Sequence, residues 1–136
     1  MKYLLDTDTC IAVLRGRAET IEELSRHAPE EMAVSSITRY ELLYGARRCN
    51  ARRRVREEAK VEQFLGLLHE IAFTDDTADR AADLRISLEA KGQSIGPMDT
   101  LIAATALCNG LTLVSGNLGE FGRVPGLGTE DWIRLE

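Results

Sequence analysis

The chain has 136 residues, of which 44% are hydrophobic and 29% charged, and its formal net charge is −5. This length fits one domain with a buried core, and the net negative charge does not by itself indicate a nucleic-acid-binding protein. Asp6 and Asp8 interrupt the first apolar run, which excludes a secretory signal, and no apolar run approaches the ~18 residues of a membrane span. We therefore expect a soluble, cytoplasmic protein with one domain over residues 1–136.

In chain order, apolar periodicity and turn residues predict strands that alternate with helices. We expect a strand at Tyr3–Leu5, helices at Thr9–Arg15 and Ala18–His27, a strand at Met32–Ser35, a helix opened by Thr38, a helix at Ala51–Leu68, a strand at Glu70–Thr74, a helix capped by Thr77 that ends near Gly92, a helix from Pro97 to Gly110, and a strand at Leu111–Val114. The tail from Asn117 to Glu136 is expected to be loop-rich and held by Trp132.

The apolar faces of the longer helices follow from their spacing. In the Ala51–Leu68 helix, the expected apolar face consists of Val55, Ala59, Phe64, Leu65 and Leu68. Strands alternating with helices predict an α/β fold, with a mainly parallel sheet of four or five strands covered by helices on both faces. In such sheets ligands bind beyond the carboxyl ends of the strands, so functional side chains are expected there.

Cysteine and histidine are too scattered to form a zinc or redox site. Cys10, Cys49 and Cys108 are far apart and form no CxxC pair, so we expect reduced thiols that pack as small apolar side chains. His27 and His69 also stand alone and are expected at the surface or its boundary. Any metal bound by this chain must therefore be held by oxygen ligands.

Three acidic residues lie at predicted strand ends or helix starts, and each also has a purely structural explanation. Asp6 directly follows the first strand, where it could cap the next helix, although Thr7, Asp8 and Thr9 could serve equally as caps. Glu41 completes a capping box that begins at Thr38. Asp99 places a favourable charge at a helix amino terminus, yet that helix is apolar on nearly every side, and an unpaired buried carboxylate costs several kcal/mol.

Asn117 and Glu120 follow the last predicted strand, and each taken alone is a plausible loop residue. Together with the three acids they place oxygen side chains at one edge of the sheet, where carboxylates repel each other unless a proton or a cation intervenes. Mg²⁺ or Mn²⁺ prefers such ligands and can activate a water for in-line attack on a phosphodiester. The sequence contains no Ser-His-Asp set, reactive cysteine setting or P-loop.

Four segments resemble, in order and spacing, the PIN-domain ribonucleases called VapC, which are toxins of toxin–antitoxin pairs. The segments are MKYLLDTDTCIAVL, SSITRYELLYGA, IGPMDTLIAATA and LVSGNLGEFGRVPGL, and the resemblance covers nearly the whole chain. It implies a PIN-like three-layer α/β/α sandwich and endonucleolytic cleavage of RNA that depends on Mg²⁺, with Mn²⁺ as a substitute. It also implies a homodimer, a cognate VapB-type antitoxin, and tRNA as a common target.

The resemblance also assigns roles to individual residues. By position, Asp6 and Asp99 match the family's metal-binding aspartates, and Glu41 matches its conserved glutamate. The chain departs from the family at Asn117, where many members have Asp and others have Asn with a nearby Glu, as here with Glu120. Because Asn carries no charge, the number of metal ions that the site binds, one or two, stays open. One solution is that Asn117 binds a metal ion through a water while Glu120 supplies the charge.

Basic residues gather in one segment, from Arg47 to Lys60, where seven basic residues and two glutamates give a local charge of +5. If the segment is one helix, Arg53–Glu57 and Arg54–Glu58 pair at i,i+4. Four of the other basic side chains, Arg48, Arg52, Arg56 and Lys60, then form a stripe about 18 Å long. The stripe is a candidate for RNA phosphate contacts, a docking surface for an acidic antitoxin segment, or a solvated helix face.

Two other functions stay open from the sequence. Leu4-Leu5-Asp6-Thr7-Asp8-Thr9 approaches the first motif of haloacid-dehalogenase-like phosphatases, but the later motifs of that class are unconvincing here. A catalytically weak PIN module that acts by binding RNA or a partner is the second alternative, and Asn117 is the residue that favours it.

Overall fold

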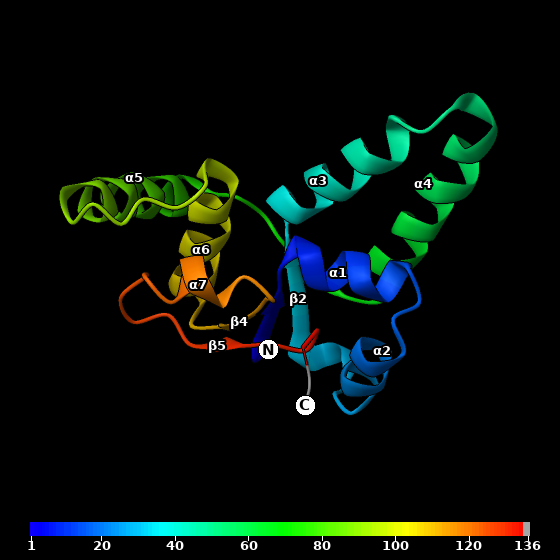
Figure 1. Cartoon of the computed structure of the whole chain (residues 1–136), viewed down its shortest axis with the longest axis horizontal. Coiled ribbons are helices and arrows are strands. Elements are labelled where there is room, and N and C mark those ends of the chain that lie inside the picture. Colours follow the sequence, from blue (N-terminus) through cyan, green and yellow to red (C-terminus); the bar gives the residue numbers. More distant parts are fainter. Residues whose placement is uncertain (135–136) are drawn as a thin grey trace.

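The protein is described here by a computed structural model covering residues 1–134 (Figure 1). Five parallel strands of the described residues form one sheet in the order β3-β2-β1-β4-β5. The strands are β1 (Tyr3–Leu5), β2 (Met32–Ser35), β3 (His69–Ile71), β4 (Thr112–Val114) and β5 (Thr129–Glu130). The predicted α/β fold with a parallel sheet is confirmed.

Helices cover both faces of this sheet. They are α1 (Thr7–Leu14), α2 (Ala18–Ser25), α3 (Ser36–Arg47), α4 (Ala51–Leu65), α5 (Asp75–Ala90), α6 (Pro97–Asn109) and α7 (Leu118–Phe121), with a 3₁₀ turn at Pro29–Glu31. Figure 1 shows α1 to α4 gathered on one side of the sheet and α5 to α7 on the other. The resulting three layers agree with the predicted sandwich.

The central strand supplies the core on both sides because successive side chains of a strand point to opposite faces. Tyr3 and Leu5 pack into a cluster with residues of α3 and α4, whereas Leu4 packs into the other cluster with residues of α5 and α6. Leu4 and Leu5 are both fully buried. Fully burying a leucine contributes roughly 1.5–3 kcal/mol, so this short strand stabilises both halves of the molecule.

Several predicted elements agree with the structure. The strands at Tyr3–Leu5 and Met32–Ser35 have the predicted bounds, and α6 begins at Pro97 as expected. Gly110 ends α6 in the left-handed conformation at φ 63°, a geometry that glycine adopts without a steric penalty. Trp132 is 1% exposed, which confirms its predicted role in the tail.

The predicted start of α3 is wrong. The helix begins at Ser36, and Ser35 is the cap, its side chain accepting a hydrogen bond from the Thr38 backbone N–H at 3.1 Å. Thr38 is instead a fully buried residue inside the first turn. Glu41 therefore lies in the second turn and is not part of a capping box, so its carboxylate is available for other contacts.

The predicted basic helix is also divided. α3 ends at Arg47 with Arg48 as its cap, and α4 starts after Asn50, whose side chain accepts a hydrogen bond from the Arg53 N–H. The expected apolar face is wrong at Val55, which is 77% exposed, and at Ala59, which is also exposed, whereas the predicted burial of Phe64 and Leu65 is confirmed. The helix buries residues nearer its end, which are Val61, Phe64 and Leu65.

The remaining differences concern element ends. β3 starts at His69, and Thr74 rather than Thr77 caps α5, because the Thr74 hydroxyl accepts the Thr77 N–H. α1 extends from Thr7 to Leu14, two residues earlier at its start than expected, and α2 stops at Ser25. The tail contains α7 and β5, and its last two residues, 135–136, lie outside the described residues.

The environments of the three cysteines bear on their chemistry. All are free thiols, with Cys10 buried, Cys49 half-buried and Cys108 exposed. Burial raises the pKa of the Cys10 thiol, an effect to which Asp6 and Asp8 add, so Cys10 is a packing residue and not a nucleophile. Over residues 1–134 the helices are all too short or too polar to cross a membrane.

Candidate active site

The carboxyl ends of β1 and β4 and the early turns of α3, α6 and α7 bring the predicted site residues to one edge of the sheet. Asp6 follows β1, and Glu41 comes from the second turn of α3. Asp99 lies in the first turn of α6, and Asn117 precedes α7, which carries Glu120. Four of these five residues are linked, directly or through one neighbour, by the polar contacts described below, and Glu41 is joined to the region through Thr7.

Asp6 is the most buried of the acids, with 5% of its surface exposed. It occupies the cap position of α1, but in the described part of the chain its side chain makes no capping hydrogen bond to the helix. Its Oδ2 instead accepts a hydrogen bond from the Ser115 hydroxyl at 2.8 Å. Burial and the nearby Asp8 charge raise the pKa of Asp6 to about 7, so without a cation this carboxylate is held at an electrostatic cost.

Asp8 and Ser115 are site residues that the sequence reasoning missed. The Asp8 Oδ2 accepts a hydrogen bond from the Gly116 N–H at 3.0 Å and lies 3.4 Å from the Ser115 Oγ. The sequence predicts only a possible capping role for Asp8, because in a run of Asp-Thr-Asp-Thr every residue can cap the helix. The sequence signal that could have found it is the second acid two residues after Asp6.

Glu41 is fixed by a hydroxyl from the neighbouring helix α1. Thr7 Oγ1 donates to Glu41 Oε1 at 2.6 Å and lies 3.1 Å from the hydroxyl oxygen of the buried Thr38. This contact joins the first turn of α1 to the second turn of α3. Only one of the two Glu41 carboxylate oxygens is used in this way, and the other is available for chemistry.

Asn117 and Glu120 form a hydrogen-bonded pair that contacts the amino terminus of α6. The Asn117 side-chain amide donates to Glu120 Oε2 and lies 3.5 Å from Asp99 Oδ2, while Glu120 Oε1 accepts the Gly96 N–H at 3.2 Å. The Asn117 hydrogen bond lowers the pKa of Glu120. Burial, followed by the adjacent Glu120, raises the pKa of Asp99 to about 6.

The donor set of this region fits a hard divalent cation. All candidate ligands are oxygens. The pKa values of Asp6 and Asp99 are raised first by burial and then by neighbouring acids, and a bound cation would offset both effects. Over residues 1–134, no three Asp, Glu, His or Cys side chains are placed as a ready-made metal cage. Mg²⁺ does not need one, because it keeps several waters and usually binds proteins through one or two carboxylates.

The residues of the predicted basic stripe differ in environment. Arg48 is the cap at the end of α3, whereas the other three residues lie on α4. The Arg48 guanidinium carbon lies 5.4 Å from the centroid of the Tyr44 ring. Lys60 pairs with Glu57 at 3.7 Å. Among the described residues, Arg52 and Arg56 form no ion pair. The predicted pairs Arg53–Glu57 and Arg54–Glu58 are confirmed, at 3.9 and 3.0 Å.

A groove of about 430 Å³ runs between α1, α3 and α4 and reaches the site at Glu41. Its apolar lining consists of Ile11, Leu14, Leu42, Ala46 and Val61. Its charged lining consists of four basic residues, Arg15, Arg48, Arg53 and Lys60, and two acids, Glu41 and Glu57, so basic residues predominate although Glu57 pairs with Arg53 and Lys60. The combination of an apolar lining and a mainly basic charged lining suits an amphipathic acidic segment.

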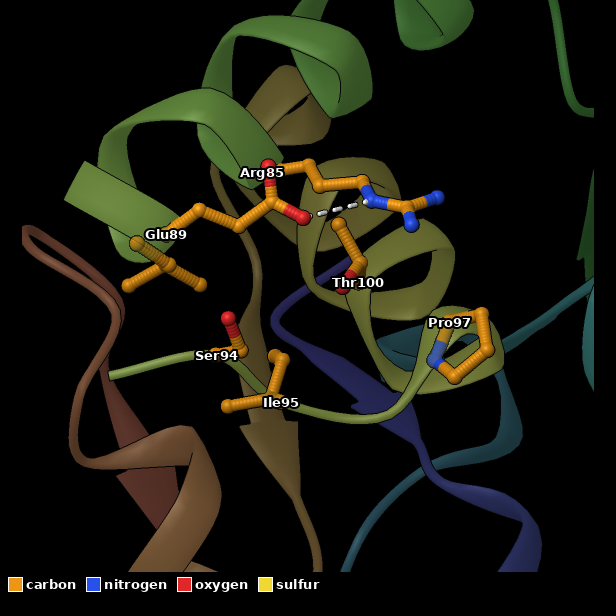
Figure 2. A pocket seen from close by; sticks show the side chains of 7 residues that line it. Arg85, Glu89, Ser94, Ile95, Pro97 and Thr100 are labelled. Carbon is orange, nitrogen blue, oxygen red and sulfur yellow. Dashed lines mark hydrogen bonds and ion pairs between the residues drawn. The ribbon is translucent and has the colours of Figure 1, made fainter. Parts of the chain in front are cut away.

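A second, smaller pocket lies between α5 and the start of α6 (Figure 2). Arg85 and Glu89 of α5 are hydrogen-bonded across its upper side at 3.3 Å, and Ile95 and Pro97 line it from the loop and from α6. Its volume of about 100 Å³ holds only a few waters. Asp6, Glu41, Asp99, Asn117 and Glu120 do not line this pocket, so it is separate from the candidate site.

Comparison with known proteins gives consistent matches over nearly the whole chain. The family model described as PIN domain matches residues 3–127. The tRNA(fMet)-specific endonuclease VapC of Salmonella typhimurium is 39% identical over 97% of this chain and 98% of its own length. Ribonuclease VapC2 of Haemophilus influenzae is 38% identical over 98% of this chain and 99% of its own.

Solved structures agree with these matches. A crystal structure of DNA-bound VapBC from Salmonella typhimurium superposes with a TM-score of 0.90 at 39% identity, covering 97% of this chain and 98% of that chain. A structure of VapBC2 from Rickettsia felis, bound to a DNA fragment from its promoter, gives a TM-score of 0.88 at 32% identity, covering 97% and 99%.

The raised pKa of Asp6 predicts a specific pH dependence of stability for the metal-free protein. Because the folded-state pKa is about 7 and the reference value is 3.8, the folded protein binds the extra proton between these values. Stability from this group is therefore fully present below about pH 4 and is lost as the pH rises through 7. One pKa unit corresponds to about 1.4 kcal/mol, so the contribution of Asp6 to the free energy of unfolding can change by at most about 4 kcal/mol over this pH range.

Urea unfolding in EDTA between pH 4 and 8 measures this effect, with Asp6→Asn as the matched variant that cannot titrate. The difference in unfolding free energy between the original protein and Asp6→Asn should fall across this range. A difference that stays constant with pH would show that Asp6 is ionised throughout.

Proposed function

The chain belongs to the PIN-domain family and, within it, to the VapC ribonucleases, and from this premise we propose that it is a toxin endoribonuclease that hydrolyses RNA phosphodiester bonds at the edge of the sheet described above. The observation that supports this function best is the group of buried or half-buried carboxylates of α1, α3, α6 and α7 in one region. We propose tRNA as the substrate class, in keeping with the Salmonella relative, which is named a tRNA(fMet)-specific endonuclease.

We assign the reaction to five residues, Asp6, Glu41, Asp99, Asn117 and Glu120. Asp6 and Asp99 would hold the metal, since burial and neighbouring acids both disfavour their ionised forms and a cation would stabilise them. Glu41 uses its second carboxylate oxygen as a proton acceptor, because Thr7 already occupies Oε1. Asn117 orients Glu120 through its amide, and Glu120 supplies the negative charge that Asn117 lacks.

VapC nucleases of the PIN family are generally metal-dependent. We propose Mg²⁺ as the ion here, with Mn²⁺ as a substitute, because both prefer oxygen ligands. When bound, such an ion neutralises phosphate charge and lowers the pKa of a water molecule. The protein's own contribution is to fix the carboxylates in place and to exclude solvent around Asp6.

A catalytically weak PIN module that only binds RNA or a partner is the second candidate. Asn117 favours it, because the residue removes one charge from the site. Asp6, Glu41 and Asp99 speak against it, since a binding module has no need for buried carboxylates with raised pKa values. The phosphatase alternative is not supported by the family match.

The protein should cleave a total small-RNA pool with Mg²⁺ and lose this activity with EDTA. Asp6→Asn and Asp99→Asn should each lower the cleavage rate by about 100-fold or more, because each removes a charged metal ligand. Asp79→Asn, at an exposed acid of α5, is the matched control and should cut normally. RNA binding without cutting under any condition would instead favour the binding module.

Basic residues on α4 are proposed to contact RNA phosphates. Of the four stripe residues, Arg52 and Arg56 suit this role best, because among the described residues they are exposed and form no ion pair. Arg48 and Lys60 line the groove and are secondary candidates.

Replacing both Arg52 and Arg56 by alanine should weaken RNA binding and flatten its salt dependence. Each lost phosphate contact reduces the magnitude of the slope of log K against log salt by about 0.7 for single-stranded regions and about 0.9 for duplex regions. Fluorescence anisotropy on an Asp6→Asn background measures binding without cleavage, with Arg80→Ala on α5 as control. An unchanged slope would show that these two arginines do not contact RNA.

We propose that a VapB-type antitoxin places an amphipathic acidic segment in the groove between α1, α3 and α4. The solved relatives from Salmonella and Rickettsia are VapBC complexes, which supports a partner of this kind.

We further propose a homodimer through exposed aromatic side chains of α3. Tyr40 and Tyr44 are 57% and 58% exposed, and their ring centroids lie 6.5 Å apart. Sedimentation equilibrium measures the mass of the assembly and tests this proposal.

Gly45 provides a test of the groove, because a Cβ added there meets no atom within 4 Å and the residue lines the groove. Gly45→Ala should leave antitoxin binding intact and stabilise α3 by up to about 1 kcal/mol. Gly45→Trp should fill the groove and reduce antitoxin affinity at least tenfold in calorimetric titration. Equal affinity of the two variants would place the antitoxin elsewhere.

A further inference from the structure

Ser115 lies directly after β4, in the middle of the acidic region, and it is not one of the acids. Its side chain is fully buried. The Ser115 Oγ donates a hydrogen bond to Asp6 Oδ2 at 2.8 Å and accepts one from the Asn117 N–H at 2.9 Å. A single hydroxyl therefore contacts both Asp6, directly after β1, and Asn117, the first residue of the Asn117–Glu120 pair.

The proton and one of the two lone pairs of this hydroxyl are used by these two neighbours. A serine has one proton to donate, and the 2.8 Å contact with Asp6 takes it. The Asp8 carboxylate is at 3.4 Å, a longer and weaker contact. One oxygen lone pair receives the Asn117 N–H. The orientation of the hydroxyl is thus set from both sides.

The backbone around Ser115 holds this hydroxyl in place. The Ser115 N–H donates to the Glu130 carbonyl at 2.9 Å, which ties the residue to β5. The next residue, Gly116, donates its N–H to Asp8 Oδ2 at 3.0 Å. Since strand pairing on one side and α1 on the other fix the backbone, the hydroxyl can impose its position on its partners.

We propose that Ser115 is a positioning residue for the reaction, which aligns the Asp6 carboxylate and fixes the turn that presents Asn117 and Glu120. The inference rests on the proposed function, since it assigns Ser115 a role in that same site. A hydroxyl suits the role because it donates to a buried carboxylate without adding charge. An acid here would repel Asp6, and a lysine or arginine would compete with a cation.

The two contacts of Ser115 have separable consequences. Loss of the donated bond leaves the Asp6 carboxylate with no side-chain donor among residues 1–134. Loss of the accepted bond releases the Asn117 N–H, and the Asn117 amide then orients Glu120 less well. Both effects act on the chemical step, whereas neither contact faces the exposed arginines proposed to bind RNA.

Ser115→Ala tests the inference, because it deletes only the hydroxyl. The rate constant for RNA cleavage should fall by about 10- to 100-fold, the range expected when one charge-assisted hydrogen bond is lost, with KM for RNA unchanged. In the metal-free protein, amide hydrogen exchange at Asn117 should accelerate at least tenfold. The amides of Leu113 and Ser115, which donate to Gly128 and Glu130, should keep their protection. Ser115→Cys, with a weak donor of similar size, should give an intermediate rate.

Thr105→Val is the matched control, since it deletes another fully buried hydroxyl, one that donates to the Leu101 carbonyl within α6. It should leave cleavage unchanged. Cleavage by Ser115→Ala at the original rate, unchanged exchange at Asn117, or equal acceleration at all three amides would each overturn the inference. If the original protein does not cut RNA, the proposed function fails, while exchange at Asn117 still tests the placement of the turn.

Discussion

Negative charge confined to one edge of a small sheet is the constraint on which the rest of this structure depends. Asp6 is almost fully withdrawn from water, and both Asp8 and Asp99 raise its pKa further. Such an arrangement is unfavourable in an isolated fold, so the surrounding residues supply dipoles rather than charges. The Ser115 and Thr7 hydroxyls, the Asn117 amide and the Gly96 and Gly116 N–H groups all donate to carboxylates here. Neutral donors limit the repulsion and leave a net charge that a cation can use.

The sheet order explains how residues far apart in sequence reach this edge. β1 lies between β2 and β4, so the residues after these strands are neighbours in space, although Asp6 and Ser115 are 109 positions apart. Because all the strands are parallel, their carboxyl ends share one side of the sheet. The core supports this arrangement on both faces, with Leu4 in one apolar cluster and Leu5 in the other.

Much of this organisation could be predicted from the sequence, because short apolar runs and capping residues mark β1, β2 and α6 clearly. The acids at strand ends were also placed correctly at one edge. What the sequence could not resolve is which of several similar residues fills a role. Ser35 and Thr38 are both good caps, and only packing buries Thr38 inside the helix. Val55 has the spacing of a core residue, yet α4 reaches the sheet only near its end, so Val55 is exposed. Ser115 carries no charge and gives no local signal.

The turn between α3 and α4 has a consequence for how this chain can change in evolution. At Cys49 and Asn50 the chain reverses direction away from the sheet, as Figure 1 shows for the outer end of the two helices. Insertions there lengthen a surface projection and leave the acids untouched. In β1 the situation is the opposite, since adding one residue before Asp6 would exchange the two faces of the strand. Length variation among descendants of this sequence should therefore accumulate at the α3–α4 turn and be absent from β1.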